Sequence, residues 1–592
     1  MPNAKTSSWT IIKEAGLLIL KSSITFFLLL WLLTRCQSTS PTATTSEQLA
    51  TKQTPPAAVP PVPEEVDQVY QHPEIISVPD EEAVEEDVVL DLDIVMEETE
   101  IDELVFEEAP EMEAVDRIPE NFNTEEYDRI YENRFQKVGE HPLSTFSIDV
   151  DNASYSNVRR YLTQYHELPP PDAVRIEEMI NYFSYNYPQP TGKHPFTITT
   201  EVATCPWNAD HQLLHIGLQG KSLDYDDVRP SNLVFLLDVS GSMEDPNKLP
   251  LVKKSFRRLV DALDAQDRVA MVVYAGAAGL VLPATPAGEK QTIEAALGRL
   301  AAGGSTAGGE GIELAYQIAE EQLIPEGNNR VILATDGDFN IGTSSTGDLV
   351  RLIEEKRQKG IYLTICGFGM GNYKDGRMEQ ISNAGNGNYF YIDNVQEAEK
   401  VFVREMRANL FTIAKDVKLQ LEFNPTQVKE YRLIGYENRM LAREDFDDDQ
   451  KDAGELGAGH TVTALYELIP ADPKEAFLAD ASLKYQQSTL TPQANSNELL
   501  ALKLRYKPIG RESSVLLEQR VQQRDVAKGT PSDDFRFSAA VAGFGMLLRQ
   551  SSYLNEWDWT AVSELAKSVD TASNSDREEF LRLVKTASLL AE

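Results

Sequence analysis

The central part of the chain predicts an α/β fold with a doubly wound, mostly parallel sheet. Between about 232 and 393, short apolar runs typical of buried strands alternate with segments whose apolar residues recur at helical spacing. Repeated β-α units of this kind place helices on both faces of a parallel sheet. We expect strands at 233–237, 269–274, 331–334 and 361–365. We expect helices at 249–263, 291–300, 311–322 and 348–359, the last ended by a glycine.

The first predicted strand leads directly into a loop of small polar residues. Asp238, Ser240 and Ser242 occupy alternate positions there and offer one carboxylate and two hydroxyls. Thr306 lies in a glycine-rich run, and Asp336 follows the third predicted strand. Oxygen donors without nitrogen or sulfur suit hard cations such as Mg²⁺, Mn²⁺ or Ca²⁺. The alternative is that these Ser and Asp side chains cap the following helix, but three segments in this order favour a metal site.

This pattern resembles the metal-ion-dependent adhesion site of von Willebrand factor type A domains. That site has DxSxS, then a Thr, then an Asp before Gly, and all five ligand types are present here. The resemblance implies strand order 3-2-1-4-5-6, with the ligand beyond the carboxyl ends of the strands where the order reverses. It also implies that the three hydroxyls contact the metal and that the two aspartates act directly or through water.

The same resemblance implies a mode of binding. Two carboxylates roughly balance the charge of Mg²⁺, Mn²⁺ or Ca²⁺, so the cation can take one more anionic oxygen. In the family that oxygen typically comes from an Asp or Glu of a partner protein. We therefore expect recognition of a protein ligand through a metal bridge.

Catalytic motifs do not support an enzyme. The chain has no GxSxG elbow and no Ser-His-Asp arrangement with supporting context. The glycine-rich run at 303–309 lacks the Gly-Lys-Ser/Thr ending of a phosphate loop. His211 and His215 are spaced as in metalloproteases, but the glutamate between them is missing. Their neighbours alternate as in a strand, where residues four apart lie about 13 Å from each other and cannot share a metal.

The N-terminus predicts export and attachment to a membrane. Lys5 and Lys13 precede an apolar core at 24–33, and Cys36 follows it closely. This arrangement within 1–36 resembles a bacterial lipoprotein cleavage site, although Arg35 stands where such sites have a small residue. An uncleaved span at 15–33 is the alternative. In either case we expect a membrane-anchored protein of the bacterial cell envelope whose body is exported.

Acidic residues dominate the composition and give the chain a formal net charge of −39. Much of this charge lies between 53 and 116, which has neither Lys nor Arg and includes a proline cluster. We expect 37–118 to be a disordered, acidic linker, with a short docking motif at 88–95 as the alternative. The acidity argues against nucleic-acid binding, which needs clustered Lys and Arg.

Two further regions flank the predicted von Willebrand domain at 229–408. Motifs such as 142–151 and 169–178 make 119–228 resemble the N-terminal segment of a bacterial group of von Willebrand factor A proteins. That group also has a C-terminal domain without assigned function, which 409–592 resembles. Both flanks are predicted to be α+β regions.

The C-terminal region predicts strands followed by helices. We expect the strands at 461–468 and 499–506 and the helices at 537–548, 560–568 and 576–590. Ser575 and Glu578 form a plausible capping box for the last helix. Cys366 ends a predicted strand and is expected to be a buried thiol, with a disulfide to Cys205 as the alternative.

Two functions are consistent with this organisation. The first is a membrane-tethered module that binds a protein partner through the metal. The second is an envelope scaffold in which the von Willebrand domain packs against its own flanks and the metal is structural.

Overall fold

The computed structural model of the chain describes residues 125–148, 151–223, 229–304, 308–337, 346–371, 373–472, 489–527, 529–571 and 574–592. The signal or anchor at 1–36, the linker at 37–118, Cys36 and Thr306 lie outside these residues. No helix within the described ranges is long and apolar enough to cross a membrane. All described residues belong to the compact unit Glu113–Glu592.

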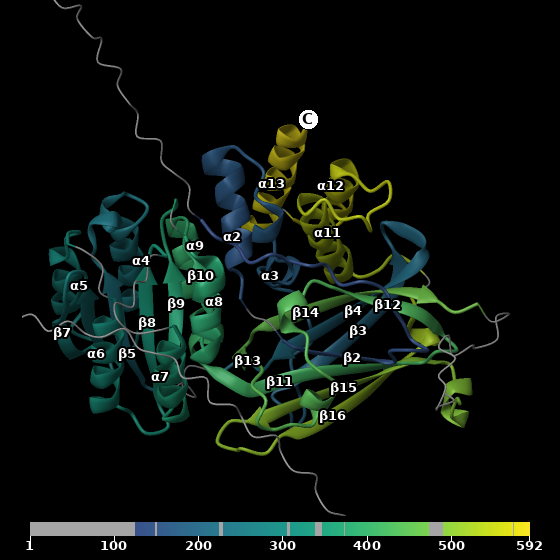
Figure 1. The fold of residues 1–592 in the computed structure, drawn as a ribbon, viewed down its shortest axis with the longest axis horizontal. Coiled ribbons are helices and arrows are strands. Elements are labelled where there is room, and N and C mark those ends of the chain that lie inside the picture. Colours follow the sequence, from purple (N-terminus) through teal and green to yellow (C-terminus); the bar gives the residue numbers. More distant parts are fainter. Residues whose placement is uncertain are drawn as a thin grey trace, which may run out of the picture. The chain divides into compact units, whose positions relative to one another are not determined.

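The predicted sheet is present and has six strands in the order β10-β9-β8-β5-β6-β7 (Figure 1). Its strands are β5 (Ser231–Asp238), β6 (Arg268–Tyr274), β7 (Ala278–Pro286), β8 (Asn328–Thr335), β9 (Ile361–Gly367) and β10 (Tyr389–Tyr391). Numbered along the chain, this is the order 3-2-1-4-5-6 that the resemblance implies. All neighbours pair in parallel except β6 and β7, which are antiparallel. The doubly wound, mostly parallel sheet is confirmed.

Strand β5 is buried on both faces because its side chains alternate between two cores. Leu233, Phe235 and Leu237 pack against α4 and α5 on one face. Val234 and Leu236 lie in the core on the other face, which also contains side chains of α6, α7 and α8. Because both faces of such a strand are buried, its sequence is an unbroken apolar run, as it is at 233–237. The helices are α4 (Leu249–Ala262), α5 (Lys290–Arg299), α6 (Gly308–Glu321), α7 (Thr346–Gln358), α8 (Asp375–Ala384), α9 (Val395–Glu399) and α10 (Met406–Leu410).

The two flanking regions fold together into a pair of antiparallel sheets around a shared core. One sheet contains β1 (Gln136–Lys137), β12 (Val428–Ile434), β14 (Thr461–Pro470), β4 (Asn208–Gly220) and β3 (Phe196–Cys205). The other contains β13 (Gly454–Gly457), β11 (Thr412–Phe423), β15 (Glu498–Pro508) and β16 (Val515–Gln522), with β2 (Leu143–Ser147) paired to β11. Both sheets contain strands from before and after the central sheet, which pair directly with one another, as β14 pairs with β4 and β11 with β2. Neither flank completes these sheets without the other.

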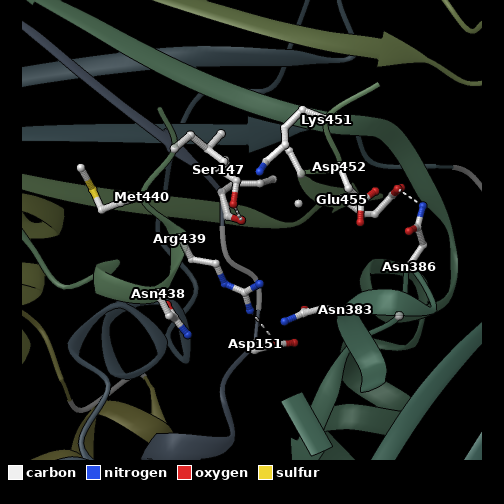
Figure 2. A pocket seen from close by; sticks show the side chains of 15 residues that line it. Ser147, Asp151, Asn383, Asn386, Asn438, Arg439, Met440, Lys451, Asp452 and Glu455 are labelled. Carbon is white, nitrogen blue, oxygen red and sulfur yellow. Dashed lines mark hydrogen bonds and ion pairs between the residues drawn. The ribbon is translucent and has the colours of Figure 1, made fainter. Parts of the chain in front are cut away.

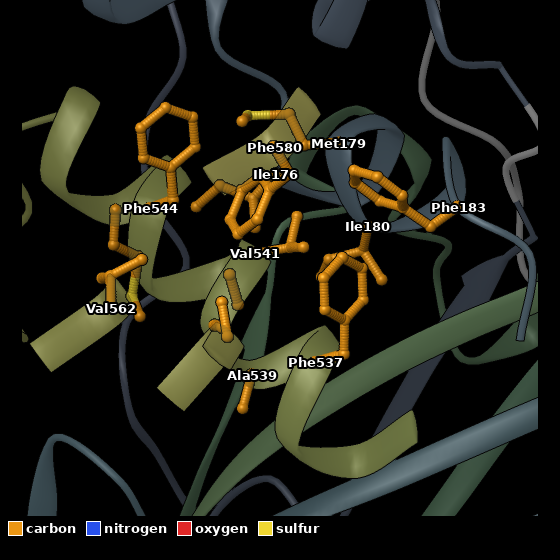
Figure 3. Close-up of a cluster of buried hydrophobic side chains, with 14 of the residues drawn as sticks. Ile176, Met179, Ile180, Phe183, Phe537, Ala539, Val541, Phe544, Val562 and Phe580 are labelled. Atoms are coloured by element: carbon orange, nitrogen blue, oxygen red, sulfur yellow. The ribbon is translucent and has the colours of Figure 1, made fainter. Parts of the chain in front are cut away.

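Helices from both ends of the chain form a third core (Figure 3). They are α2 (Ala153–Arg160), α3 (Ile176–Asn181), α11 (Asp533–Leu548), α12 (Trp559–Lys567) and α13 (Ser575–Ala591). Phe183, just after α3, contacts Phe537 and Phe580 with ring centroids 4.9 and 5.8 Å apart. These edge-to-face contacts bind the N-terminal flank to the C-terminal helices.

The predicted capping box of α13 is wrong. The N-cap is Asn574, whose side-chain oxygen accepts hydrogen bonds from the backbone N–H groups of Asp576 and Arg577 at 3.0 and 3.2 Å. Ser575 is therefore the first residue inside the helix. Asparagine and serine are both good N-caps, so the sequence allowed either start.

Both cysteines of the described body are free and buried. Cys205 ends β3, whereas Cys366 lies in β9 of the central sheet. Burial raises the pKa of both thiols, which keeps them protonated. The buried thiol predicted for Cys366 is confirmed, and no disulfide joins it to Cys205.

A buried group of charges joins the central domain to its flanks. Arg159 on α2 lies between Asp393, just after β10, Glu397 on α9 and Glu579 on α13. Its Nε lies 2.8 Å from Asp393 Oδ2, its Nη2 2.7 Å from Glu397 Oε2 and its Nη1 2.9 Å from Glu579 Oε1. We call these four residues the Arg159 cluster. It gives the domain contacts with both the N-terminal and the C-terminal flank.

Candidate metal centre

Four of the five predicted metal ligands lie within the described residues, at one end of the central sheet. Asp238 is the last residue of β5, and Asp336 directly follows β8. These two strands are parallel neighbours, so their carboxyl ends meet at the same edge. Ser240 lies just before the 3₁₀ turn Gly241–Glu244, and Ser242 lies within it. The aspartates therefore lie next to the point where the strand order reverses.

The glycine-rich segment that precedes Thr306 lies against the same loop. The Gly303 N–H donates to the Val239 carbonyl at 2.7 Å, and the Gly241 N–H donates to the Gly304 carbonyl at 3.0 Å. Thr306 itself lies outside the described residues. These two bonds bring the third segment of the motif to the loop that carries the serines.

Hydrogen bonds hold the loop in shape around Asp238. The Ser240 N–H donates to Asp238 Oδ1 at 2.9 Å, and the Thr335 hydroxyl donates to Asp238 Oδ2 at 3.4 Å. The hydroxyl oxygens of Ser240 and Ser242 are 3.0 Å apart. Two serine oxygens and a carboxylate thus converge over a few ångströms.

Burial makes the site electrostatically unusual. Asp238 and Asp336 are 1% and 2% exposed, whereas Ser242 is exposed at the rim. The pKa of Asp238 is raised to about 6, because burial, with a smaller contribution from the nearby Asp336 carboxylate, outweighs the hydrogen bonds that lower it. At neutral pH Asp238 is a buried anion beside a second one, an arrangement that a cation stabilises.

Sequence reasoning missed one residue at this site. Lys248 immediately precedes α4, and its Nζ lies 3.0 Å from Asp336 Oδ2 and 2.9 Å from the Ser242 carbonyl oxygen. No local pattern indicates this contact, because a lysine before a helix normally points into solvent. Its place is visible only once β8 and the serine loop are brought together.

The donor set fits a hard divalent cation. Asp238, Asp336 and the two serines offer only oxygen, as Mg²⁺, Mn²⁺ and Ca²⁺ require. Across the described ranges, no group of three or more His, Cys, Asp and Glu side chains could hold a metal ion. A metal at this edge would therefore depend on hydroxyl ligands as well as the two carboxylates.

The two histidines singled out from the sequence have separate partners. Both lie in β4, as predicted from the alternation around them. His211 Nδ1 lies 2.6 Å from Glu467 Oε1, and His215 Nε2 lies 2.9 Å from the Tyr187 hydroxyl. Burial lowers the pKa of His215 to about 4, so it is neutral. They serve the packing of the flanking sheets.

A second concave site lies between α8 and the flanking strands. It is a cavity of about 270 Å³ with a polar wall (Figure 2). Its side chains pair with one another: Arg439 Nη2 lies 3.1 Å from Asp151 Oδ2, and Asn386 Nδ2 donates to Glu455 Oε1 at 2.6 Å. Neither His nor Cys is among its lining residues, and the Ser147 hydroxyl donates to the adjacent Ile148 carbonyl.

Comparison with known families matches three parts of the chain. Residues 232–404 match the family described as von Willebrand factor type A domain, and 121–215 match the family described as von Willebrand factor. Residues 408–590 match the family described as "Uncharacterized protein YfbK, C-terminal". The three matches cover the central sheet and both flanks.

Several proteins are similar over all or part of this length. "Uncharacterized protein YfbK" of Escherichia coli (strain K12) is 43% identical over 477 residues, 79% of this chain and 82% of that protein. Protein sll0103 of Synechocystis is 31% identical over 191 residues, 32% of this chain and 44% of that protein. Human inter-alpha-trypsin inhibitor heavy chain H4 is 29% identical over 150 residues, 24% of this chain and 16% of that protein.

Solved structures with the same kind of domain are more distant. A von Willebrand factor type A protein from Catenulispora acidiphila is 16% identical, with a TM-score of 0.39, over 67% of this chain and 91% of that chain. The ArnB paralog VWA2 from Sulfolobus acidocaldarius is 13% identical, with a TM-score of 0.32, over 67% of this chain and 97% of that chain. On the extent and identity of the match to the Escherichia coli protein, this chain belongs to the YfbK family of von Willebrand factor type A domain proteins.

Proposed function

We propose that this protein binds a partner protein through a divalent cation held by Asp238, Ser240, Ser242, Thr306 and Asp336. Von Willebrand factor type A domains generally mediate protein interactions, often with a metal. The observation that carries the proposal is the pair of buried carboxylates at adjacent strand ends beneath an exposed serine. When bound, the cation would supply a bridge to an Asp or Glu carboxylate of the partner.

The rim of the site supports this role because it is open to a partner. Gly241, Ser242, Glu244 and Asp245 are all exposed. The two acidic residues add negative charge around the buried aspartates, so a partner carboxylate is repelled unless a cation intervenes. Binding at this rim should therefore depend strongly on the metal.

We also propose that the protein acts at the bacterial cell envelope, without catalytic activity. The apolar run at 24–33 followed by Cys36 supports attachment by a lipid or by a single uncleaved span, with the body exported. The acidic stretch at 37–118 supports an extended connection between that anchor and the folded unit. No motif in the sequence supports a reaction.

A second function is favoured by the Arg159 cluster. Its ion pairs and the shared sheets fix the von Willebrand domain to both flanks, as a scaffold would require. In that case the metal would stabilise the domain and would not recruit a partner. The two functions differ in what loss of the metal does.

Capture of partner proteins by the immobilised full chain distinguishes the binding function from the scaffold function. With Mg²⁺ present we expect a defined set of envelope proteins to bind, and we expect chelator or Asp238→Ala to release them while the protein stays folded. Asp261→Ala is the control, because Asp261 is an exposed aspartate near the end of α4. Capture by Asp238→Ala in chelator would contradict the metal bridge. A fall of many degrees in its melting temperature, without a binding defect, would favour the scaffold.

A further inference from the structure

We infer that the Lys248 ammonium is a tethered cation that competes with the divalent metal for Asp336 and thereby lowers the metal affinity of the free protein. This inference rests on the proposed function, since it concerns the same site. Its consequence is that metal and partner bind together: the partner carboxylate supplies the negative charge that tips the balance toward the metal.

The ammonium lies among the atoms that a metal would contact. Its Nζ bonds Asp336 Oδ2 at 3.0 Å and the carbonyl oxygen of Ser242 at 2.9 Å. The side chains of Lys248 and Asp336 are 8% and 1% exposed, so water does little to screen this pair. Asp245 Oδ2 lies farther out, at 4.0 Å. The positive charge is thus directed at a proposed metal ligand.

The backbone around Lys248 is shaped to hold this side chain in place. The Lys248 N–H donates to the Asp245 carbonyl at 2.9 Å, and Pro250 follows within the first turn of α4. The lysine stem crosses Gly369, which has φ of +74°. A Cβ added to that glycine would lie 2.5 Å from Lys248 Cε. A residue without a side chain at 369 therefore leaves the space that the stem occupies.

Charge decides the effect of this contact on a metal. A divalent cation bound to Asp336 would share that carboxylate with an ammonium of the same sign, and like charges in a buried site repel strongly. The lysine must move away, or the metal must bind more weakly. A neutral side chain at 248 removes the repulsion and takes this counter-charge away from Asp336, and both effects favour the metal.

Calorimetric titration of Mg²⁺ and of Mn²⁺ into the chelator-stripped full chain tests this. We expect Lys248→Met to bind each ion at least tenfold more tightly than the wild type. Lys254→Met is the matched control, because it removes the same charge from an exposed position of α4 and should leave the affinity unchanged. Lys248→Gln keeps a hydrogen-bond donor without the charge and gives the same test if the Met variant does not fold.

Thermal unfolding gives a second readout. Without metal, Lys248→Met should melt below the wild type, because Asp336 loses the ammonium, and Mg²⁺ should raise its melting temperature by more than it raises that of the wild type. Equal or weaker metal binding by both Lys248 variants would overturn the inference alone and would make Lys248 a residue that positions Asp336. Absence of metal binding by the wild type and both variants would overturn the proposed site and the inference with it.

Discussion

The Arg159 cluster and Asp238 of the metal centre both bury carboxylates, but the partners of those carboxylates differ in charge. Asp393 and Glu397 share the guanidinium of Arg159, which bonds both directly. Asp238 accepts hydrogen bonds from neutral donors, the Ser240 N–H and the Thr335 hydroxyl, and its pKa rises to about 6. A carboxylate that is buried with its counter-charge contributes to the fold. One that is buried among neutral donors keeps an affinity for a cation.

The largest effect is expected at the Arg159 cluster. Arg159→Met should lower the free energy of unfolding by about 3–5 kcal/mol, because it removes the cation that Asp393 and Glu397 share. Urea denaturation of the full chain measures this. Arg258→Met is the control, since its ion pair with Glu399 is exposed and should contribute at most about 1 kcal/mol. Equal changes in the two variants would remove the distinction between the two regions.

At the metal centre, removal of a charge is expected to raise the free energy of unfolding instead of lowering it. Asp238→Asn should raise the stability of the metal-free protein at pH 8 by about 2–3 kcal/mol, since it removes a buried charge whose pKa shift has that energetic equivalent. The same variant should no longer bind the metal. Denaturation in chelator and titration with Mg²⁺ measure the two properties. A variant less stable than the wild type would show that interactions in the folded protein already offset the cost of burying the Asp238 charge.

The pH dependence sharpens the same comparison. The pKa of Asp238 is raised from 3.8 to about 6, so the folded protein binds this proton more tightly than the unfolded chain does. The protonated Asp238 therefore adds to the free energy of unfolding below about pH 4, and this contribution is lost as pH rises through 6. Metal affinity changes in the opposite direction, because protons compete with the cation. Mg²⁺ titrations from pH 5 to 8 should show the affinity falling about tenfold per unit below pH 6. A constant affinity over this range would exclude direct involvement of Asp238.

The smallest effect on stability is expected from treatment with a thiol reductant. Cys205 and Cys366 are free, so the flanks are joined to the central domain without a disulfide between them. Dithiothreitol should therefore shift the melting temperature by less than about 1 °C, in contrast to the several degrees expected when a native disulfide is lost. A large shift in the chain carrying Cys36→Ser would contradict this.

The sequence predicts those features of the structure that depend on residues close together in the chain. The strands that carry Asp238 and Asp336 are predicted to within a few residues, because strands buried on both faces are continuous apolar runs. Strand β7 is missed because it is a partly exposed edge strand that contains Gly279 and Pro283. Helix α13 is placed correctly, but its cap is assigned one residue too late.

Long-range pairing escapes sequence reasoning altogether. Phe146 in β2 lies opposite Leu419 in β11, and Ile216 in β4 lies opposite Ala464 in β14. Nothing in the local pattern of either strand specifies a partner that follows an entire intervening domain. Lys248 is missed for the same reason, since its contact with Asp336 joins a helix start to the end of a different strand.

Titration of Mg²⁺, Mn²⁺ and Ca²⁺ into the chelator-stripped full chain, beside Asp238→Ala, tests the central claim most directly. We predict that calorimetry will show one bound ion per chain for at least one of these cations, and that the variant will bind none. No binding of any of the three ions, or equal binding by wild type and variant, would contradict a metal centre at Asp238 and Asp336.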